Sequence, residues 1–530
     1  MTILTDRRRL LTGAGGLTLF AGLAAHVPAW GATFAENPFT LGVASGDPWS
    51  DGFVIWTRLA PRPLDEHGGM PMVAVPVLWE VAEDECFSRI VQAGEAVARP
   101  ELGHSIHVEV GGLKPHWRYW YRFRLDGGHA SLVGRVRTAP LANLTPDRLR
   151  MAVAGCQSFP GGWYEAYRHL SQEPDLDVVF HYGDYIYETG GGRRTLPVIL
   201  DASGAQVSRD HVGGEIYSLD DYRRRYAQYK SDPDLQAAHA AAAFVSSFDD
   251  HEVDNNWADD HDQDGTPPEA FLLRRYAAMQ AWYENMPVRR AQFPRPGGLT
   301  MYRSLDFGRL VRMNVLDTRS YRNDQLCARP GQEACRIEDG PDATILGAAQ
   351  ESWLASALSG ESRWNLIAQQ VWVLPLFERG EDGVLQRRPS TDTWTGYPAA
   401  RARLVRTIAD RGLSNVVVST GDAHIHAVGV VPMRDDELDG PAAATEFLAT
   451  SISSGGDGSP NLDEKGRRLV ADNPHIDLLN QQRGYQTFDI TPTEWRTAVK
   501  VMDKVQSRGG RLSTLARYAV SPETPALHRV

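Results

Sequence analysis

Four polar segments, each directly after an apolar run, hold the side chains of this sequence that are best suited to chemistry. They are Gly155-Cys156-Gln157, Gly183-Asp184 with Tyr187, Asp249-Asp250-His251-Glu252, and Gly421-Asp422-Ala423-His424. A single aspartate after a glycine is usually part of a turn, and a single histidine is usually a hydrogen-bonded structural residue. Four such segments at strand ends of one α/β sheet would meet in one pocket, because ligands bind at the carboxyl ends of strands. A thiolate, carboxylates, a phenol and an imidazole together indicate a metal site.

The segment Val178–Glu188, VVFHYGDYIYE, is the centre of this prediction. Its short apolar run, ended by a glycine, is typical of a strand covered on both faces. Asp184 follows at the strand end, and Tyr187 can turn its phenol oxygen toward the same point. Two hard oxygen donors suit a ferric ion or another highly charged cation. The alternative is that Asp184 only caps the next segment and that the tyrosines pack in the core.

Strand-like and helix-period runs alternate after residue 148, which predicts an α/β layered domain. We expect strands at 149–154, 178–182, 310–316, 365–373 and 415–419, and helices at 163–170, 219–229, 235–244, 268–286, 346–358 and 398–410. The segments 447–454, 485–490 and 497–502 have strand character again, which favours mixed sheets. The predicted catalytic domain is 148–506, and 507–530 is expected to be a C-terminal tail.

The part of the chain before residue 139 is predicted to be entirely β. Short alternating segments such as GFVIWT at 52–57 and WRYWYRFRL at 117–125 are separated by Gly, Pro and Asp turns. The run Gly112–Pro115 followed by Tyr119 is similar to a strand entry of an immunoglobulin-like or fibronectin-like sandwich. We therefore predict an N-terminal β-sandwich domain at 32–139, acting as scaffold or partner surface, and a linker at 140–147.

Length and composition exclude several classes of protein. A chain of 530 residues is too long for one ordinary core, which favours two domains. Hydrophobic residues at 42% and charged residues at 23% describe a globular protein rather than a disordered or membrane-embedded one. A net charge of −12 argues against a nucleic-acid-binding surface, which needs clustered positive charge.

The first 31 residues predict an export signal. Arg7-Arg8-Arg9 precedes a mildly apolar, glycine-rich run, which is similar to a twin-arginine signal. The alternative, a membrane anchor, is less favoured because glycines interrupt the run and because it is short for a membrane span. We expect the twin-arginine export machinery as a partner, a periplasmic or secreted location, and no transmembrane anchor after signal removal. In an exported protein, Cys327 and Cys335 could form a local disulfide.

The order of these motifs resembles that of the metallophosphoesterase superfamily, and most closely that of the PhoD-like alkaline phosphatases. The strings that carry the resemblance are VASGDP (43–48), HYGDYIYE (181–188), DDHEVDNN (249–256), VLDTRSYR (315–322) and TGDAH (420–424). Together with the sandwich-then-α/β order, the resemblance covers nearly the whole chain.

The resemblance implies a metal site like that of purple acid phosphatases, with a thiolate in the first position. By this resemblance Fe(3+) would be bound by Cys156, Asp184, Tyr187 and His424, and Ca(2+) would be bound by a bridging Asp184 with Asp250 and Asp422. Asp422 stands where a histidine is usual, and the usual additional histidine is not found. This loss of nitrogen donors fits calcium, which prefers oxygen ligands. Glu252, Asn255 and Asn256 are further candidate ligands.

Two further residues are candidates for contact with the substrate. His251 could contact the phosphoryl oxygen or protonate the departing alkoxide; the alternative is a structural histidine held by Glu252. Arg223, in the run Tyr222–Tyr226, could bind phosphate oxygens as a fork; the alternative is a solvated basic helix face.

The resemblance implies an exported hydrolase that cleaves phosphate monoesters and diesters by attack of a metal-activated hydroxide, for phosphate scavenging. One alternative keeps the site but acts on lipid headgroups or teichoic acid, as a phospholipase D-like diesterase. An iron-thiolate redox protein is an alternative of another class, although the paired aspartates would have no purpose there. A surface-binding protein with an inactive site is the last alternative.

Overall fold

A computed structural model describes residues 34–530 except 193–196, 297, 326–339, 381 and 388–391. The predicted signal at 1–31 and the predicted Cys327–Cys335 pair lie outside the described residues. Within the described part of the chain, every helix is too short or too polar to cross a membrane.

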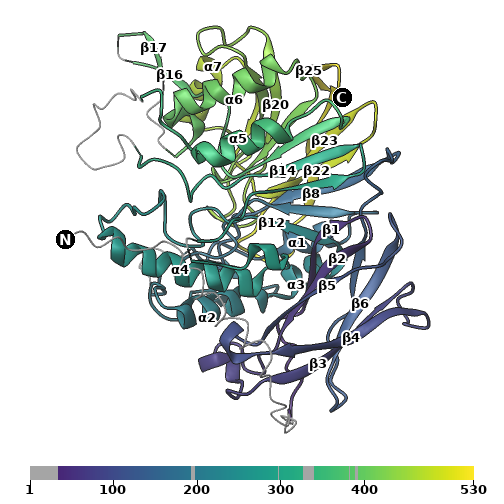
Figure 1. The fold of residues 1–530 in the computed structure, drawn as a ribbon. Helices are drawn as coiled ribbons and strands as arrows, with labels where there is room; N and C mark the ends of the chain where they lie inside the picture. The colour runs from purple at the N-terminus through teal and green to yellow at the C-terminus, as the bar shows by residue number, and fades with distance from the viewer. Residues whose placement is uncertain (1–33, 193–196, 297, 326–339, 381, 388–391) are drawn as a thin grey trace, which may run out of the picture.

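A ten-stranded mixed sheet runs through the whole molecule (Figure 1). In spatial order its strands are β25 (Thr524–Arg529), β24 (Leu512–Ser521), β23 (Trp495–Met502), β22 (Gly484–Ile490), β8 (Leu149–Ala154), β9 (Val178–His181), β12 (Ala243–Ser246), β1 (Val43–Trp49), β2 (Gly52–Arg58) and β5 (Ser105–Val110). The central strands β8, β9 and β12 are parallel neighbours. They are almost entirely buried, as expected for apolar strands covered on both faces.

A second, seven-stranded mixed sheet belongs to the part of the chain after residue 300. Its order is β13 (Arg303–Phe307), β14 (Val311–Val315), β15 (Trp364–Ala368), β18 (Val416–Thr420), β20 (Ala442–Leu448), β19 (His426–Pro432) and β21 (Ile476–Asn480). Buried residues of both sheets, such as Phe180 and Val417, belong to one hydrophobic core. The two sheets therefore pack face to face.

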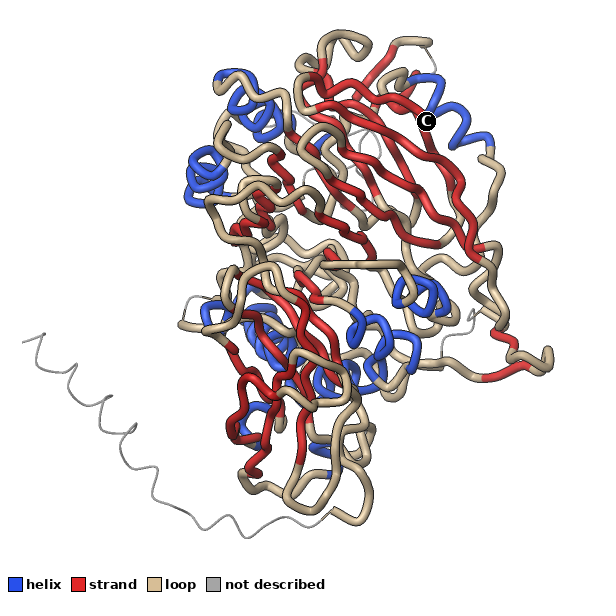
Figure 2. Tube along the Cα trace, turned by 90° about the vertical axis from the view of Figure 1, so that its right-hand side faces the viewer, coloured by secondary structure: helices blue, strands red, loops and turns tan. Residues whose placement is uncertain are grey.

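Helices, blue in Figure 2, lie at the periphery of both halves of the molecule, beside the seven-stranded sheet and also beside the strands near the N-terminal domain. They are α1 (Glu165–Ser171), α2 (Leu219–Lys230), α3 (Pro233–Ala241), α4 (Pro268–Asn285), α5 (Gly347–Ala357), α6 (Pro398–Asp410) and α7 (Glu464–Asp472). Leu354 of α5 and Ile408 of α6 pack with Ile367 and Val418 of the seven-stranded sheet in a second core. The predicted α/β (α+β) domain with mixed sheets is confirmed.

The N-terminal β-sandwich is also present, but it shares one sheet with the rest of the chain. A four-stranded sheet in the order β4 (Ile90–Ala98), β3 (Val75–Ala82), β6 (Arg118–Arg124), β7 (Gly134–Arg137) packs on β1, β2 and β5 through a third core. Ser45 of β1 pairs in parallel with Ala243 of β12. The sandwich is therefore joined to the second domain by backbone hydrogen bonds.

Two predicted elements are corrected by the structure. Residues 507–530, expected to be a tail, contain β24 and β25 of the ten-stranded sheet. The helix expected at 235–244 ends at Ala241, and Ala243–Ser246 is instead strand β12. This short strand leads into Asp249 and Asp250, so it fulfils the strand-end requirement for the third motif.

Two small hairpins complete the strands. They are β10 (Ile199–Leu200) with β11 (Gln206–Val207), and β16 (Phe377–Arg379) with β17 (Leu385–Arg387).

Candidate active site

The four predicted polar segments meet where the carboxyl ends of strands from the two sheets lie close together. Cys156 follows β8, Asp184 follows β9 and Asp250 follows β12, so three ligand-bearing loops leave neighbouring parallel strands. Asp422 and His424 follow β18 of the other sheet. The face-to-face packing of the sheets brings the fourth segment to the first three.

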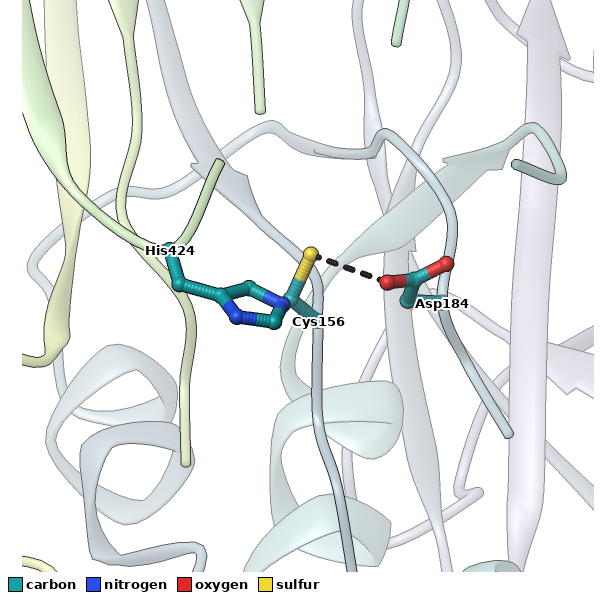
Figure 3. A group of neighbouring side chains, drawn as sticks. All are labelled: Cys156, Asp184 and His424. Carbon is teal, nitrogen blue, oxygen red and sulfur yellow. Dashed lines mark hydrogen bonds between the residues drawn. The ribbon is translucent and has the colours of Figure 1, made fainter. Parts of the chain in front are cut away.

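The first group of side chains combines sulfur, oxygen and nitrogen donors (Figure 3). One ligand atom from each of Cys156, Asp184 and His424 lies within 4.8 Å of the others. The thiol Sγ of Cys156 is 3.3 Å from Oδ2 of Asp184. The phenol oxygen of Tyr187 is 2.9 Å from the same Oδ2 and 3.1 Å from Nε2 of His424. All four predicted iron ligands thus converge.

A second group beside the first contains only carboxylates. Oxygens of Asp249, Asp250 and Asp422 also lie within 4.8 Å of one another, and Asp184 forms a similar group with Asp250 and His251. Asp184 therefore stands between the two groups, where the sequence predicts a bridging ligand. Asp249 was not among the predicted ligands; its Oδ2 is buried without a hydrogen-bond partner.

A buried arginine that sequence analysis did not single out lies against the carboxylate group. Arg319 Nε is 2.6 Å from Oδ1 of Asp249, and its Nη2 is 3.8 Å from Asp250 and 3.7 Å from Asp422. A fourth carboxylate, Asp392, accepts a hydrogen bond from Nη1 at 2.5 Å. The guanidinium supplies one positive charge to several negative ones, so it balances the group only in part.

The backbone at the predicted ligands is strained. Cys156, Asp184, Asp422 and His424 all have positive φ, between 50° and 65°. This left-handed conformation costs a non-glycine residue about 1–2 kcal/mol. Strain of this kind is retained at functional sites, where the surrounding structure enforces it. Each side chain is thereby turned from its strand end into the common cluster.

The buried acidic groups of the cluster resist ionisation unless a positive charge lies beside them. Burial, followed by the charges of Asp184 and Asp422, raises the pKa of the Cys156 thiol well above its usual value. Burial and the neighbouring Asp250 likewise raise the pKa of Asp184. Burial lowers the pKa of His424 to about 3, which leaves a neutral imidazole able to bind a metal. A bound cation would favour the ionised ligands, so the residues present fit a metal centre.

His251 is held by a carboxylate other than the one expected. Its Nδ1 is 2.7 Å from Oε2 of Glu188, and its ring lies 4.1 Å from the Tyr187 ring, centroid to centroid. Burial alone would lower the pKa of His251, but the charges of Glu188, Asp250 and Asp184 raise it well above the usual value. Glu188 lies within the HYGDYIYE string, yet the sequence does not reveal this pairing.

Glu252 does not hold His251. It binds the backbone at the ends of two strands instead. Its buried carboxylate accepts hydrogen bonds from the backbone N–H groups of Asp184 (3.1 Å), Tyr185 (2.7 Å) and Asp249 (2.9 Å). It thereby ties the loop after β9 to the loop after β12. Among the described residues, Glu252 is not part of the clusters of metal-type ligands, and its contacts give it a positioning role.

The prediction that Arg223 binds phosphate is corrected. Its guanidinium lies on α2, donates to Glu284 at 2.6 and 2.7 Å, and reaches the backbone oxygen of Glu101. Asp220 is 3.3 Å away. Arg223 therefore connects α2 to α4 and to the N-terminal domain, and its donors are directed away from the cluster.

A pocket of about 440 Å³ opens above the first group. Its lining comes from the loops after β8, β9, β12, β18 and β20, and includes Ser158, Tyr187, Thr189, His251, His424 and Ser454. A solvent-open cavity whose lining includes two of the candidate ligands, Tyr187 and His424, is a typical arrangement of a hydrolase active site.

Comparison with known proteins agrees with this class. Residues 151–499 match the family model described as PhoD-like phosphatase, and residues 24–140 match its N-terminal domain. Alkaline phosphatase D of Bacillus subtilis (strain 168) is 42% identical over 535 residues, covering 99% of this chain and 89% of the relative. The solved structure described as "Structure of PhoD" is 41% identical, with a TM-score of 0.86, and the match covers 94% of this chain and 93% of that one. The chain belongs to the PhoD-like phosphatase family.

Proposed function

We propose that this phosphatase hydrolyses phosphate monoesters and diesters with cations held at the floor of the pocket. The observation that carries the proposal is the convergence of Cys156, Asp184 and His424 within 4.8 Å, beside Tyr187. A thiolate, a phenolate and a carboxylate suit a ferric ion. Bound cations would offset phosphoryl charge and lower the pKa of water.

The second group favours a different cation. Asp250 and Asp422 of this group, and Asp184 between the two groups, offer only oxygen atoms, which suits calcium better than a metal that prefers nitrogen or sulfur. Asp249 is an additional candidate because one of its oxygens is buried and unpartnered. Two adjacent sites with unlike donors thus support an iron–calcium pair.

The protein's own residues would orient the ester and supply a proton. The leaving oxygen needs a proton as the ester bond breaks, and His251 lines the pocket with Nδ1 engaged by Glu188. The proton would therefore come from Nε2 of His251.

We further propose that the enzyme is exported and releases phosphate from organic esters outside the cytoplasm. Support comes from the sequence of residues 1–31, with its arginines before a glycine-rich apolar run. Replacing Arg8 and Arg9 by lysine should retain the enzyme in the cytoplasmic fraction; unchanged export would contradict this part of the proposal.

The test of the metal-dependent activity is Cys156→Ala, with Cys86→Ala as the control. Cys156 is buried in the cluster, whereas Cys86 is an exposed free cysteine. The Cys156 variant should lose bound iron and release of phosphate from a chromogenic monoester and diester, while the Cys86 variant should keep both. A fully metallated and fully active Cys156→Ala protein would refute the proposed ligand set.

A further inference from the structure

We propose that Ser454 is a positioning residue, whose hydroxyl holds the phenol oxygen of Tyr187 in place for metal binding. This inference rests on the proposed function, because it concerns the same cluster. Ser454 lies in the loop after β20 and is 2% exposed.

The hydroxyl of Ser454 connects two of the ligand-bearing loops. Its Oγ is 2.6 Å from the phenol oxygen of Tyr187 and donates to the backbone oxygen of Cys156 at 2.7 Å. It also accepts a hydrogen bond from the backbone N–H of Ser158 at 3.1 Å. The side chain of Ser454, which is 298 positions further along the chain than Cys156, thus links the loop after β8 to the loop after β9.

The chemistry of a phenolate gives this contact a specific role. A protonated Tyr187 can donate to Ser454, but a phenolate can only accept hydrogen bonds. The other contacts of that oxygen are Oδ2 of Asp184 and Nε2 of His424, both of which would themselves act as ligands. Among the contacts described for this oxygen, the Ser454 hydroxyl is the group that can donate a hydrogen bond to a metal-bound phenolate. Its O–H would turn from the Cys156 backbone oxygen to Tyr187.

The position of Ser454 is fixed by a buried arginine. Nη1 of Arg483 donates to the backbone oxygen of Ser454, and to Oγ of Ser451 at 2.6 Å. Arg483 is 3% exposed. Gly455, the next residue along the chain, has a φ of +83°, so the chain turns away directly after Ser454. The hydroxyl is therefore held in place before any cation binds.

The experiment compares Ser454→Ala with Ser453→Ala in the ferric-loaded protein. Ser453 is equally buried and donates to the backbone oxygen of Ser158 at 2.8 Å, but it does not contact Tyr187. The readouts are ferric affinity, the visible phenolate-to-iron absorption band, and kcat with KM. Tyr187→Phe assigns the band to Tyr187, and thermal unfolding checks that each variant folds.

Loss of the hydrogen bond leaves a more electron-rich phenolate, so Ser454→Ala should move the band to longer wavelength. Ferric affinity or kcat should fall about 10- to 100-fold, as for other partners of metal ligands. Ser453→Ala should leave the band unchanged. A visible spectrum that Tyr187→Phe leaves unchanged, or the absence of visible absorption from the ferric parent, would overturn the proposed ligand set and this inference with it. An unchanged band and unchanged affinity in Ser454→Ala would overturn this inference alone.

Discussion

His251 is better placed to deliver a proton than to hold the cluster together. Its Nδ1 contacts Glu188, a carboxylate outside the proposed ligand set, and the charge of Glu188 favours the protonated ring. We expect His251→Ala to keep its bound metals and its fold but to lose about 10²- to 10⁴-fold in turnover, the usual contribution of a general acid. Metal content and kcat measured on the same sample check this, with the exposed His261→Ala as control. Unchanged turnover would make His251 a structural residue.

Arg223 should matter for stability and not for catalysis. Its partner Glu284 has a fully buried side chain, at 0% exposure. Removing the arginine takes away the ion-pair partner of this buried carboxylate, and breaking a buried pair costs about 3–5 kcal/mol. Arg223→Ala should therefore lower the free energy of unfolding, measured by urea denaturation, while the folded enzyme keeps its kcat. Arg224→Ala, at a more exposed pair with Asp221, is the control. A stable variant with low kcat would restore the phosphate-binding role.

Individual site residues were predictable where they lie directly after an apolar, strand-like run. Cys156, Asp184 and His424 each follow an apolar run within a few positions, so strand-end reasoning locates them. Ser454 could not be found in this way, because its role depends on contacts with residues far away in the chain: Ser454 and Cys156 are 298 positions apart. Arg319 does follow a predicted strand, within the string VLDTRSYR, but its position there does not reveal that it contacts carboxylates of two other loops. Arg223 was misjudged because a run of arginines on a helix does not reveal which of them is buried.

The carboxyl ends of four strands position the residues of the site. Parallel β8, β9 and β12 deliver three loops to one edge, and β18 delivers the fourth from the opposing sheet. The alternation of strand and helix patterns predicted the α/β architecture, but it did not predict that the fourth loop comes from a second sheet. The strand β12 was not, because its four residues directly follow the alanine-rich end of α3 and continue the apolar run.

The C-terminal strands should be essential for folding. Tyr518 and Val520 of β24 are 1% exposed, and the Tyr518 ring lies 6.5 Å from that of Phe447 in the other sheet. A chain that ends at residue 506 loses these contacts. The burial of each apolar side chain contributes about 1.5–3 kcal/mol to stability. The truncation also exposes the edge of β23. We expect insoluble or strongly destabilised protein in a solubility and urea-denaturation assay.

The control for this truncation is Thr524→Ala, at an exposed position of the edge strand β25. A soluble truncated enzyme with parental stability would show that 507–530 behaves as the tail that the sequence suggested.

At the scale of the whole molecule, the ten-stranded sheet makes one unit of the two predicted domains. The pairing of β1 with β12 places the N-terminal strands next to the strand that carries Asp249 and Asp250 toward the site. Sequence patterns predicted two domains but not this connection, because strand pairing between distant segments leaves no local signal. Through this pairing, the N-terminal domain supports the strand that leads to Asp249 and Asp250.

The most direct test of the account is anomalous X-ray diffraction at the iron edge on crystals of the purified, metal-loaded enzyme. We predict an iron peak bounded by Cys156, Asp184, Tyr187 and His424, with a second, non-iron cation toward Asp250 and Asp422. An enzyme that is active in the same crystals but has no metal among these side chains, or has its iron elsewhere, would contradict the central claim.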